Sequence, residues 1–234
     1  MIKLLEFSEL VEATFLHRPN RFLVKVIYNS KEIYCHLHNP GRLSELLVPR
    51  APLLILFRNG RRKTLCDVIA VKKDNEWIFT HSGYHSLIAR RIIELGLIKE
   101  LRRFIEIVPE YKFGSSRIDF LLKGDDEKLL LEVKGCTLFR GLIGYFPDAP
   151  TARGTRHLIE LIKALGYGMH SGILFLVMKK DIIEVRPNWD TDPRFAEILV
   201  KAYKKGVKMF AHTFYFDGSS LYAVREIKVN PLGK

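Results

Sequence analysis

The hydrophobic and polar positions change their period once along the chain, near residues 80–84. Before this point, short apolar runs alternate with turn sequences, and we expect strands within 12–29, 31–39, 51–59, 64–73 and 76–80. The intervening NSKE, NPG and KKDNE segments contain the Asn, Asp, Gly and Pro residues that turns favour. A short helix is expected at 42–47. Five short strands with one inserted helix predict a small β-barrel of the OB type.

After this point, the pattern predicts a mixture of helices and strands. Apolar residues at helical spacing indicate helices, and shorter apolar runs between them indicate strands. We therefore expect an α+β chain with two domains, an OB-fold-like β-barrel over 1–82 and a mixed α/β domain over 83–234. The expected helices lie within 86–97, 156–166 and 192–207, and the expected strands lie within 109–113, 117–123, 129–134, 172–178, 208–216 and 221–229.

The stretch from Arg117 to Lys134 places charged residues within two otherwise apolar strands. If these strands form a hairpin whose turn is centred between residues 125 and 126, Asp119 lies directly opposite Glu132. Opposite residues share one face of a hairpin, with Cβ atoms roughly 4.5–5.5 Å apart. Because side chains alternate along a strand, Arg117 and Lys134 lie on that same face. The hairpin therefore predicts one apolar face and one face with two acids and two cations.

Two carboxylates at this separation repel each other unless a cation lies between them or one of them is protonated. Oxygen ligands of this kind suit Mg²⁺ or Mn²⁺, and a neighbouring lysine can orient a water for hydrolysis of a phosphodiester. The alternative is a solvated hairpin with surface ion pairs. A glycosidase also uses two carboxylates, but these usually stand on separate strands or loops and have no adjoining lysine. We expect Asp119, Glu132 and Lys134 to form a catalytic site with Asp119 and Glu132 as metal ligands.

The chain carries a formal net charge of +12 and has a pI of about 9.6. A balance of this kind favours a polyanionic partner, either nucleic acid or an anionic membrane surface. The longest apolar run, GILFLVM, is too short to cross a bilayer, and the N-terminus resembles no signal peptide. We therefore expect a cytoplasmic protein that binds nucleic acid and no membrane. The absence of glutamine beside abundant Lys, Arg and Glu is typical of a thermophile.

Several basic residues are candidates for contacts with a nucleic-acid backbone. One group lies at the predicted start of the helix near residue 156, where free amide groups favour anions. Others lie in turns of the predicted barrel, which is a common place for residues that follow a phosphate backbone. The candidates are Arg18, Arg21, Arg42, Arg61, Arg62, Lys63, Arg117, Arg153, Arg156 and His157.

The three cysteines, Cys35, Cys66 and Cys136, are widely spaced and form no CxxC pair. An odd number at such spacing predicts neither a disulfide framework nor a zinc site, and it indicates a reducing compartment. His36 and His38 are a possible pair of metal ligands, but no third ligand adjoins them in the sequence. We therefore expect a tight turn after His38 and no metal site there.

Longer segments of the chain resemble the sugar fermentation stimulation protein family, SfsA. They lie in order along nearly the whole chain: RPNRF (18–22), CHLHNPGRLSELL (35–47), GSSRIDFLL (114–122), LEVKGCTL (131–138) and YFPDAPTARGTRHLIEL (145–161). Asp119 followed by Glu132-Val133-Lys134 also resembles the PD-(D/E)xK nuclease signature, although Ile118 replaces the proline. The resemblance implies an N-terminal OB fold, a PD-(D/E)xK nuclease-like second domain, and DNA binding with little sequence preference in connection with sugar metabolism.

The same resemblance implies that Asp119 and Glu132 bind a metal and that Lys134 orients the attacking water. An acid on the first helix often completes such sites, and Glu94 is the candidate here, with Glu110 as the alternative. The family usually has Asn near the start of that helix, where this chain has His85 and Ser86. Two functions stay open, namely DNA binding alone and a Mg²⁺- or Mn²⁺-dependent nuclease. The sequence does not distinguish DNA from RNA, and it leaves the oligomeric state open, with a homodimer as one possibility.

Overall fold

The computed structural model describes residues 1–58 and 64–233 and divides the chain into two compact units. The first unit contains Met1–Tyr84 and Phe214–Val224, and the second contains His85–Thr213 and Arg225–Lys234. Both units are thus assembled from segments that are distant in the sequence. The expected second domain, 83–234, differs from the second unit mainly in including 214–224.

Strand pairing explains why this late segment belongs to the first unit. The strand β16 (Ser220–Val229) pairs antiparallel with β1 (Ile2–Glu6) over Ser220 to Ala223. The preceding strand β15 (Lys208–Phe216) ends with Phe216 opposite Trp77. Periodicity along a single segment does not show which partner strand it will find, so the sequence could not assign this hairpin.

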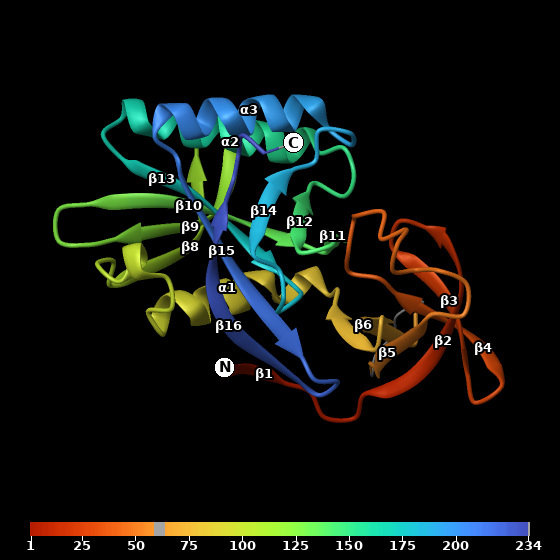
Figure 1. The fold of residues 1–234 in the computed structure, drawn as a ribbon. Coiled ribbons are helices and arrows are strands. Elements are labelled where there is room, and N and C mark those ends of the chain that lie inside the picture. The colour runs from red at the N-terminus through yellow and green to blue at the C-terminus, as the bar shows by residue number, and fades with distance from the viewer. Residues whose placement is uncertain (59–63, 234) are drawn as a thin grey trace. The chain divides into compact units, whose positions relative to one another are not determined.

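The first unit is built around a closed β-barrel of five strands (Figure 1). The strands pair in the order β5-β2-β3-β4-β6, and a further pairing of β6 with β5 closes the ring. Of these neighbours, β4 and β6 run parallel and the others antiparallel. The predicted OB-type barrel is therefore confirmed. The strands are β2 (Val11–Asn20), β3 (Leu23–Tyr28), β4 (Lys31–His36), β5 (Pro52–Phe57) and β6 (Cys66–Lys73), and β7 (Glu76–Phe79) pairs with β6.

Two hairpins of this unit turn through residues with positive φ. Asn29 and Ser30, between β3 and β4, have φ of 48° and 60°, and Asp74 and Asn75, between β6 and β7, have 49° and 62°. Positive φ at both central positions is the requirement of a type I′ turn, whose twist matches that of the flanking strands. Asn and Asp adopt this conformation more readily than most residues do. The turn residues seen in the sequence therefore fix these two hairpins.

The helix predicted at 42–47 is wrong. Leu43 has a φ of 52°, which a right-handed helix does not allow. A single turn follows, in which the amides of Leu46 and Leu47 donate to the carbonyl of Leu43 over 3.0 and 2.8 Å. Leu43 and Leu46 are fully buried, so the apolar spacing that suggested a helix reflects two side chains in the core.

The expectation that the cysteines form no disulfide is also wrong, because Cys35 and Cys66 are bonded to each other. Cys35 is paired with Cys66 across the parallel strands β4 and β6, and their Cα atoms are 4.6 Å apart. The sequence separation of 31 residues concealed this pairing. Cys136 is buried and takes no part in a disulfide.

The second unit contains a mixed sheet in the order β8-β9-β10-β13-β15. The first three strands are antiparallel, and β10, β13 and β15 are parallel. A smaller sheet follows the order β11-β12-β14-β16. The remaining strands are β8 (Glu106–Phe113), β9 (Ser116–Lys123), β10 (Lys128–Cys136), β11 (Leu138–Arg140), β12 (Ile143–Phe146), β13 (His170–Val177) and β14 (Glu184–Pro187).

Three α-helices cover the two faces of the larger sheet, with α1 (His85–Glu94) on one face and α2 (Ala152–Gly166) and α3 (Pro193–Lys205) on the other (Figure 1). Asp192 fixes both helices of the second face. Its Oδ1 accepts from the amide of Phe195 at the start of α3, and its Oδ2 accepts from the amide of Thr151, the N-cap of α2. Side-chain caps of this kind satisfy amides that the first helical turn leaves unpaired.

The predicted order of helix, three strands, helix, strand, helix and a closing pair of strands is present, with β11, β12 and β14 as additions. Apolar residues of α2 and α3 pack with β10 and β13 in one core that includes Leu158, Phe195, Leu130 and Phe175. This arrangement is the expected PD-(D/E)xK nuclease-like fold. Within the part of the chain that the structure describes, no helix combines the length and the apolar character needed to cross a membrane.

Candidate active site

The hairpin of β9 and β10 has the register predicted from the sequence. Lys123 lies opposite Lys128, and the pairing continues to Phe120 opposite Leu131. The backbone ladder ends there, one position before Asp119 and Glu132. Instead, Oδ2 of Asp119 accepts a hydrogen bond of 2.6 Å from the amide of Val133. This side-chain bond brings the Asp119 carboxylate to the segment of β10 that carries Glu132 and Lys134.

Glu132 is buried, with 2% of its surface exposed, and its two oxygens have different surroundings. Oε1 accepts from the ammonium group of Lys134 and from Nδ1 of His157, the latter over 2.5 Å. Oε2 is buried as well, and no described residue donates a hydrogen bond to it. A buried carboxylate oxygen without a donor is costly, and it indicates a place for a positive group.

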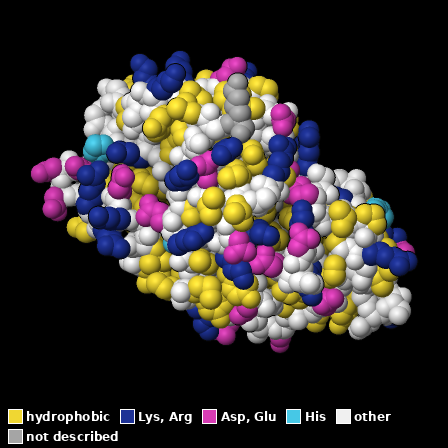
Figure 2. All heavy atoms as spheres, in the orientation of Figure 1, with side chains coloured by type: hydrophobic (Ala, Val, Ile, Leu, Met, Phe, Trp, Pro, Cys, Tyr) yellow, Lys and Arg dark blue, Asp and Glu magenta, His cyan; other side chains and the backbone are white. Residues whose placement is uncertain are grey.

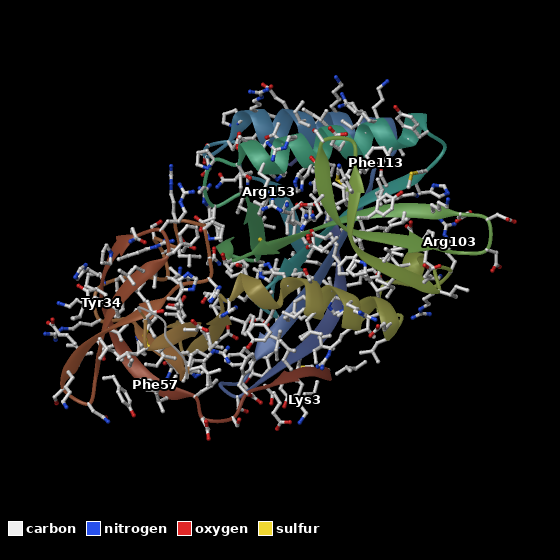
Figure 3. All side chains as sticks on the ribbon, turned by 180° about the vertical axis from the view of Figure 1, so that it is seen from behind. Lys3, Tyr34, Phe57, Arg103, Phe113 and Arg153 are labelled. Carbon is white, nitrogen blue, oxygen red and sulfur yellow. A yellow bond between two sulfur atoms is a disulfide. The ribbon has the colours of Figure 1, made fainter. Side chains whose placement is uncertain are left out.

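His157 connects this carboxylate to the start of α2. This residue is 2% exposed, and its Nε2 accepts from Nε of Arg153 over 3.4 Å. This bond assigns the proton of a neutral imidazole to Nδ1, which donates to Glu132. The sequence suggested that His157 contacts phosphate, whereas the ring is enclosed and acts on Glu132. Arg153 itself is exposed at the first turn of α2 (Figure 3).

The two carboxyl groups differ in acidity because their surroundings differ. Burial, together with the charge of Glu132, raises the pKa of Asp119 to about 6, against the opposing effects of Lys134 and the Val133 amide. Burial would also raise the pKa of Glu132, but Lys134 and His157 outweigh it and hold that pKa below its usual value. At neutral pH, both groups are ionised, and Asp119 is ionised against a local cost.

These observations test whether a divalent cation fits the residues present. Two neighbouring carboxylates, one with an orphaned buried oxygen and the other with a raised pKa, form an oxygen donor set whose negative charge Lys134 offsets only in part. Such a set suits a hard cation such as Mg²⁺ or Mn²⁺. The donor atoms of Asp119 and Glu132 therefore fit the metal that the sequence predicted.

The two candidate accessory acids are both engaged in exposed ion pairs. Glu94, at the end of α1, accepts from Arg90 over 2.7 Å, and Glu110 accepts from Arg117 over 3.1 Å. Arg117 was expected on the face of the two acids, but its side chain is 70% exposed and is directed to Glu110. That Glu94 or Glu110 completes the metal site stays a prediction.

The remaining basic candidates fall into three groups. Arg18 donates to the carbonyls of Arg42, Arg21 and Asn39 over 2.5–3.0 Å, so its guanidinium holds a loop of the barrel. The side chains of Arg21, Arg42 and Arg156 are exposed. Arg61, Arg62 and Lys63 lie outside the described residues.

His85, to which the sequence gave no role, packs against β10 one residue beyond Lys134. A Cβ placed on Gly135 would lie 2.1 Å from Cε1 of His85, so the imidazole is packed directly against the backbone of Gly135. Gly135 follows Lys134 on β10, and alternation turns its missing side chain to the opposite face from Lys134. The signal for this contact in the sequence was Gly135 itself, because a glycine within a strand often marks a place where another group packs closely against the backbone.

Fold and site together define a protein in which an OB barrel is joined to a PD-(D/E)xK nuclease-like unit. The family model of the SfsA N-terminal OB domain matches residues 16–80, and that of the sugar fermentation stimulation protein RE domain matches residues 83–220. The chain belongs to the sugar fermentation stimulation protein family, as the resemblance indicated.

Relatives and a solved structure agree with this assignment over nearly the whole chain. Sugar fermentation stimulation protein homologs from Methanothermobacter thermautotrophicus and Methanococcoides burtonii are each 43% identical to it. The first match covers 94% of this chain and 93% of the relative, and the second covers 91% and 89%. The structure of Pyrococcus furiosus SfsA in complex with Ca²⁺ has a TM-score of 0.92 at 27% identity, covering 98% of this chain and 100% of the other.

Proposed function

We propose that the second unit hydrolyses phosphodiester bonds of nucleic acid, with DNA as the favoured substrate and Mg²⁺ or Mn²⁺ as the cofactor. The observation that carries this proposal is the buried, unpartnered Oε2 of Glu132 close to Asp119. Lys134 and His157 both donate to Oε1, so Oε2 is the oxygen that is available to a metal ion. The Ca²⁺ complex of the Pyrococcus furiosus relative supports the use of a hard divalent cation.

Each residue of the site has a distinct role in this proposal. Asp119 and Glu132 hold the cation, which when bound supplies Lewis-acid polarisation of the phosphate and stabilises developing negative charge. Lys134 orients the attacking water. His157 holds the Glu132 carboxylate in place through Nδ1. Residues that hydrogen-bond to a metal ligand in this way commonly orient it and tune its affinity for the metal. Arg153 and Arg156, on the exposed first turn of α2, attract the phosphate backbone.

A cleavage assay on labelled single-stranded, double-stranded and branched DNA, and on RNA, tests the proposal. Wild type is compared with Glu132→Gln in Mn²⁺, in Mg²⁺ and in EDTA. We expect metal-dependent cleavage by wild type and a loss of about 10³-fold in Glu132→Gln, since removing a metal ligand costs several kcal/mol of transition-state stabilisation. Glu197→Ala, an exposed acid on α3, is the matched control and should retain full activity.

Folded wild-type protein that cleaves none of these substrates in either metal would refute the nuclease proposal. The second candidate function, nucleic-acid binding without cleavage, would then stand alone. The net charge of +12 and the OB barrel favour that binding independently of the carboxylates. Binding of this kind would have low sequence specificity, because backbone contacts carry no base information. Any regulation of sugar metabolism would be exerted through it.

A further inference from the structure

We propose that the first unit binds a transition-metal ion of the Zn²⁺ type through His36, His38 and Asp67. This site is separate from the carboxylates of the second unit, and the inference does not depend on nuclease activity. The three residues come from the end of β4, the loop after it and the start of β6. One ligand atom from each residue lies within 4.8 Å of the others. A tetrahedral ion with bonds of about 2 Å holds its ligands about 3.3 Å apart, so small side-chain adjustments complete the geometry.

The parallel pairing of β4 with β6 creates this cluster. His36 is paired with Asp67, so both side chains leave adjacent strands at the same level and on the same face. His38 follows two residues after His36, and the two rings meet edge to face with centroids 3.9 Å apart. Nε2 of His38 lies 3.4 Å from Oδ1 of Asp67. The third ligand that the sequence did not offer is therefore supplied by the neighbouring strand.

His81 provides a second, independent indication that a ligand belongs here. Its ring stacks on that of His38 with centroids 4.0 Å apart, and its Nε2 lies 4.0 Å from Oδ2 of Asp67. Only 5% of this residue is exposed, yet neither ring nitrogen has a hydrogen-bond partner among residues 1–58 and 64–233. Buried polar groups are normally paired, so an imidazole beside the cluster is expected to find a partner in the bound ion or in its coordinated water.

Arg58 orients the carboxylate of Asp67. Arg58 donates from Nε to Oδ2 of Asp67 over 2.9 Å and from Nη2 to the hydroxyl of Tyr84 over 3.1 Å. The guanidinium thus orients the carboxylate through Oδ2, and Oδ1 is the oxygen that lies near Nε2 of His38. Outer partners that orient ligands in this way are characteristic of metal sites.

The loop that carries His38 is held in place before any ion binds. Arg18 donates to the carbonyl of Asn39, the side chain of Asn39 donates to the carbonyl of Thr80 over 3.0 Å, and the amide of Ser82 donates to the carbonyl of His38 over 2.7 Å. These hydrogen bonds fix the position of His38 and order the loop.

Ligand chemistry separates this site from that of the second unit. Two imidazoles and one carboxylate favour Zn²⁺, Co²⁺ or Ni²⁺, whereas carboxylates alone suit Mg²⁺ and Mn²⁺. Three protein ligands leave an open coordination position, as in zinc sites that bind water or a further ligand. The chain thus has two metal sites of different hardness.

Metal-binding stoichiometry tests the inference with a tag-free full-length chain that has been treated with EDTA. The background is the double variant Asp119→Asn, Glu132→Gln, which removes the carboxylate ligands of the second unit. Equilibrium dialysis against micromolar Zn²⁺, with metal analysis, should give one ion per chain, and millimolar Mg²⁺ should not displace it. Co²⁺ should give the visible absorption bands of a four- or five-coordinate ion.

His38→Ala in this background should weaken Zn²⁺ binding by about tenfold or more and abolish those bands, because it removes one of three ligands. His36→Ala is the second variant, so that a folding defect in either one does not decide the outcome. His17→Ala removes an exposed histidine of the same unit and should bind as the background does. Absence of bound Zn²⁺ in the background, or unchanged binding in folded His38→Ala and His36→Ala, would overturn the inference.

Discussion

At the scale of single residues, the second unit contains an acid, Asp119, whose surroundings make ionisation unfavourable. Asp119 is largely buried, and its pKa is raised to about 6 by that burial and by Glu132. A folded-state pKa above the unfolded value means that the protonated side chain stabilises the fold. That contribution is complete below pH 3.8 and is lost as the pH rises through about 6. At neutral pH, the fold therefore bears a cost that a bound cation would remove.

We predict that Asp119→Asn stabilises the protein in EDTA at pH 7 by about 1–3 kcal/mol. Asparagine removes the charge, and its side-chain oxygen can still accept from the Val133 amide. Urea denaturation at pH 7 and at pH 4 measures the effect, which should shrink at the lower pH. Asp126→Asn, at the exposed tip of the same hairpin, should change little. An Asp119→Asn variant that is less stable than wild type at pH 7 would show that the charge of Asp119 does not destabilise the fold.

At the scale of elements, a buried acid joins two strands of the smaller sheet. Glu184 on β14 accepts from Lys228 over 2.6 Å, from Arg186 over 2.5 Å and from Asn230 over 3.3 Å. Burial would raise the pKa of Glu184, but these donors outweigh it and lower the pKa to about 2. A depressed pKa means that the ionised side chain stabilises the fold above pH 4.5, and that this contribution is lost as the pH falls towards 2.

We predict that Glu184→Gln lowers the free energy of unfolding at pH 7 by about 1–3 kcal/mol. This range allows for solvent screening of the interaction with Lys228, whose side chain is exposed. The difference from wild type should narrow as the pH falls below 4.5, because Glu184 then takes up a proton in the unfolded wild-type chain while it stays ionised in the folded one. Chemical denaturation from pH 7 to pH 3 measures both effects. Glu226→Gln, an exposed acid on β16, is the control. Equal stabilities of Glu184→Gln and wild type at pH 7 would contradict the prediction.

Interactions within one hairpin or helix were accessible from the sequence, and those between distant segments were not. Alternation and turn composition gave the register that places Asp119 near Glu132, because both strands flank one short turn. The partner of Glu132, His157, is 25 residues away on a helix. No periodicity relates two such elements, since their contact is set by how the helix packs on the sheet.

At the scale of the whole molecule, positive charge is spread over the chain. Lys and Arg number 38 against 26 Asp and Glu, and the excess occurs in both halves of the sequence. On the face drawn in Figure 2, basic side chains are interspersed with acidic ones and do not gather into a single patch. A distributed excess of this kind favours contacts to a phosphate backbone over recognition of particular bases.

We predict that DNA affinity falls by about 10³-fold or more between 50 and 200 mM salt, as expected for roughly six or more phosphate contacts. Arg21→Ala with Arg42→Ala should reduce the slope of log K against log salt by about 2. The loop should survive this change, because Arg18 binds the backbone carbonyls of these two residues. Fluorescence anisotropy measures the slope.

Lys204→Ala with Lys205→Ala removes the same charge from the exposed end of α3 and is the matched control. A slope that is the same in wild type and in both double variants would exclude Arg21 and Arg42 as phosphate contacts. Affinity that is independent of salt would exclude electrostatic binding altogether.

The disulfide between Cys35 and Cys66 can be used to measure how often the barrel opens. Both sulfur atoms are completely enclosed, so a thiol reductant reaches them only when β4 and β6 separate. Closing a loop of 31 residues lowers the entropy of the unfolded chain by the equivalent of about 4 kcal/mol. The rate at which a thiol reductant removes this crosslink is therefore limited by how often the two strands part.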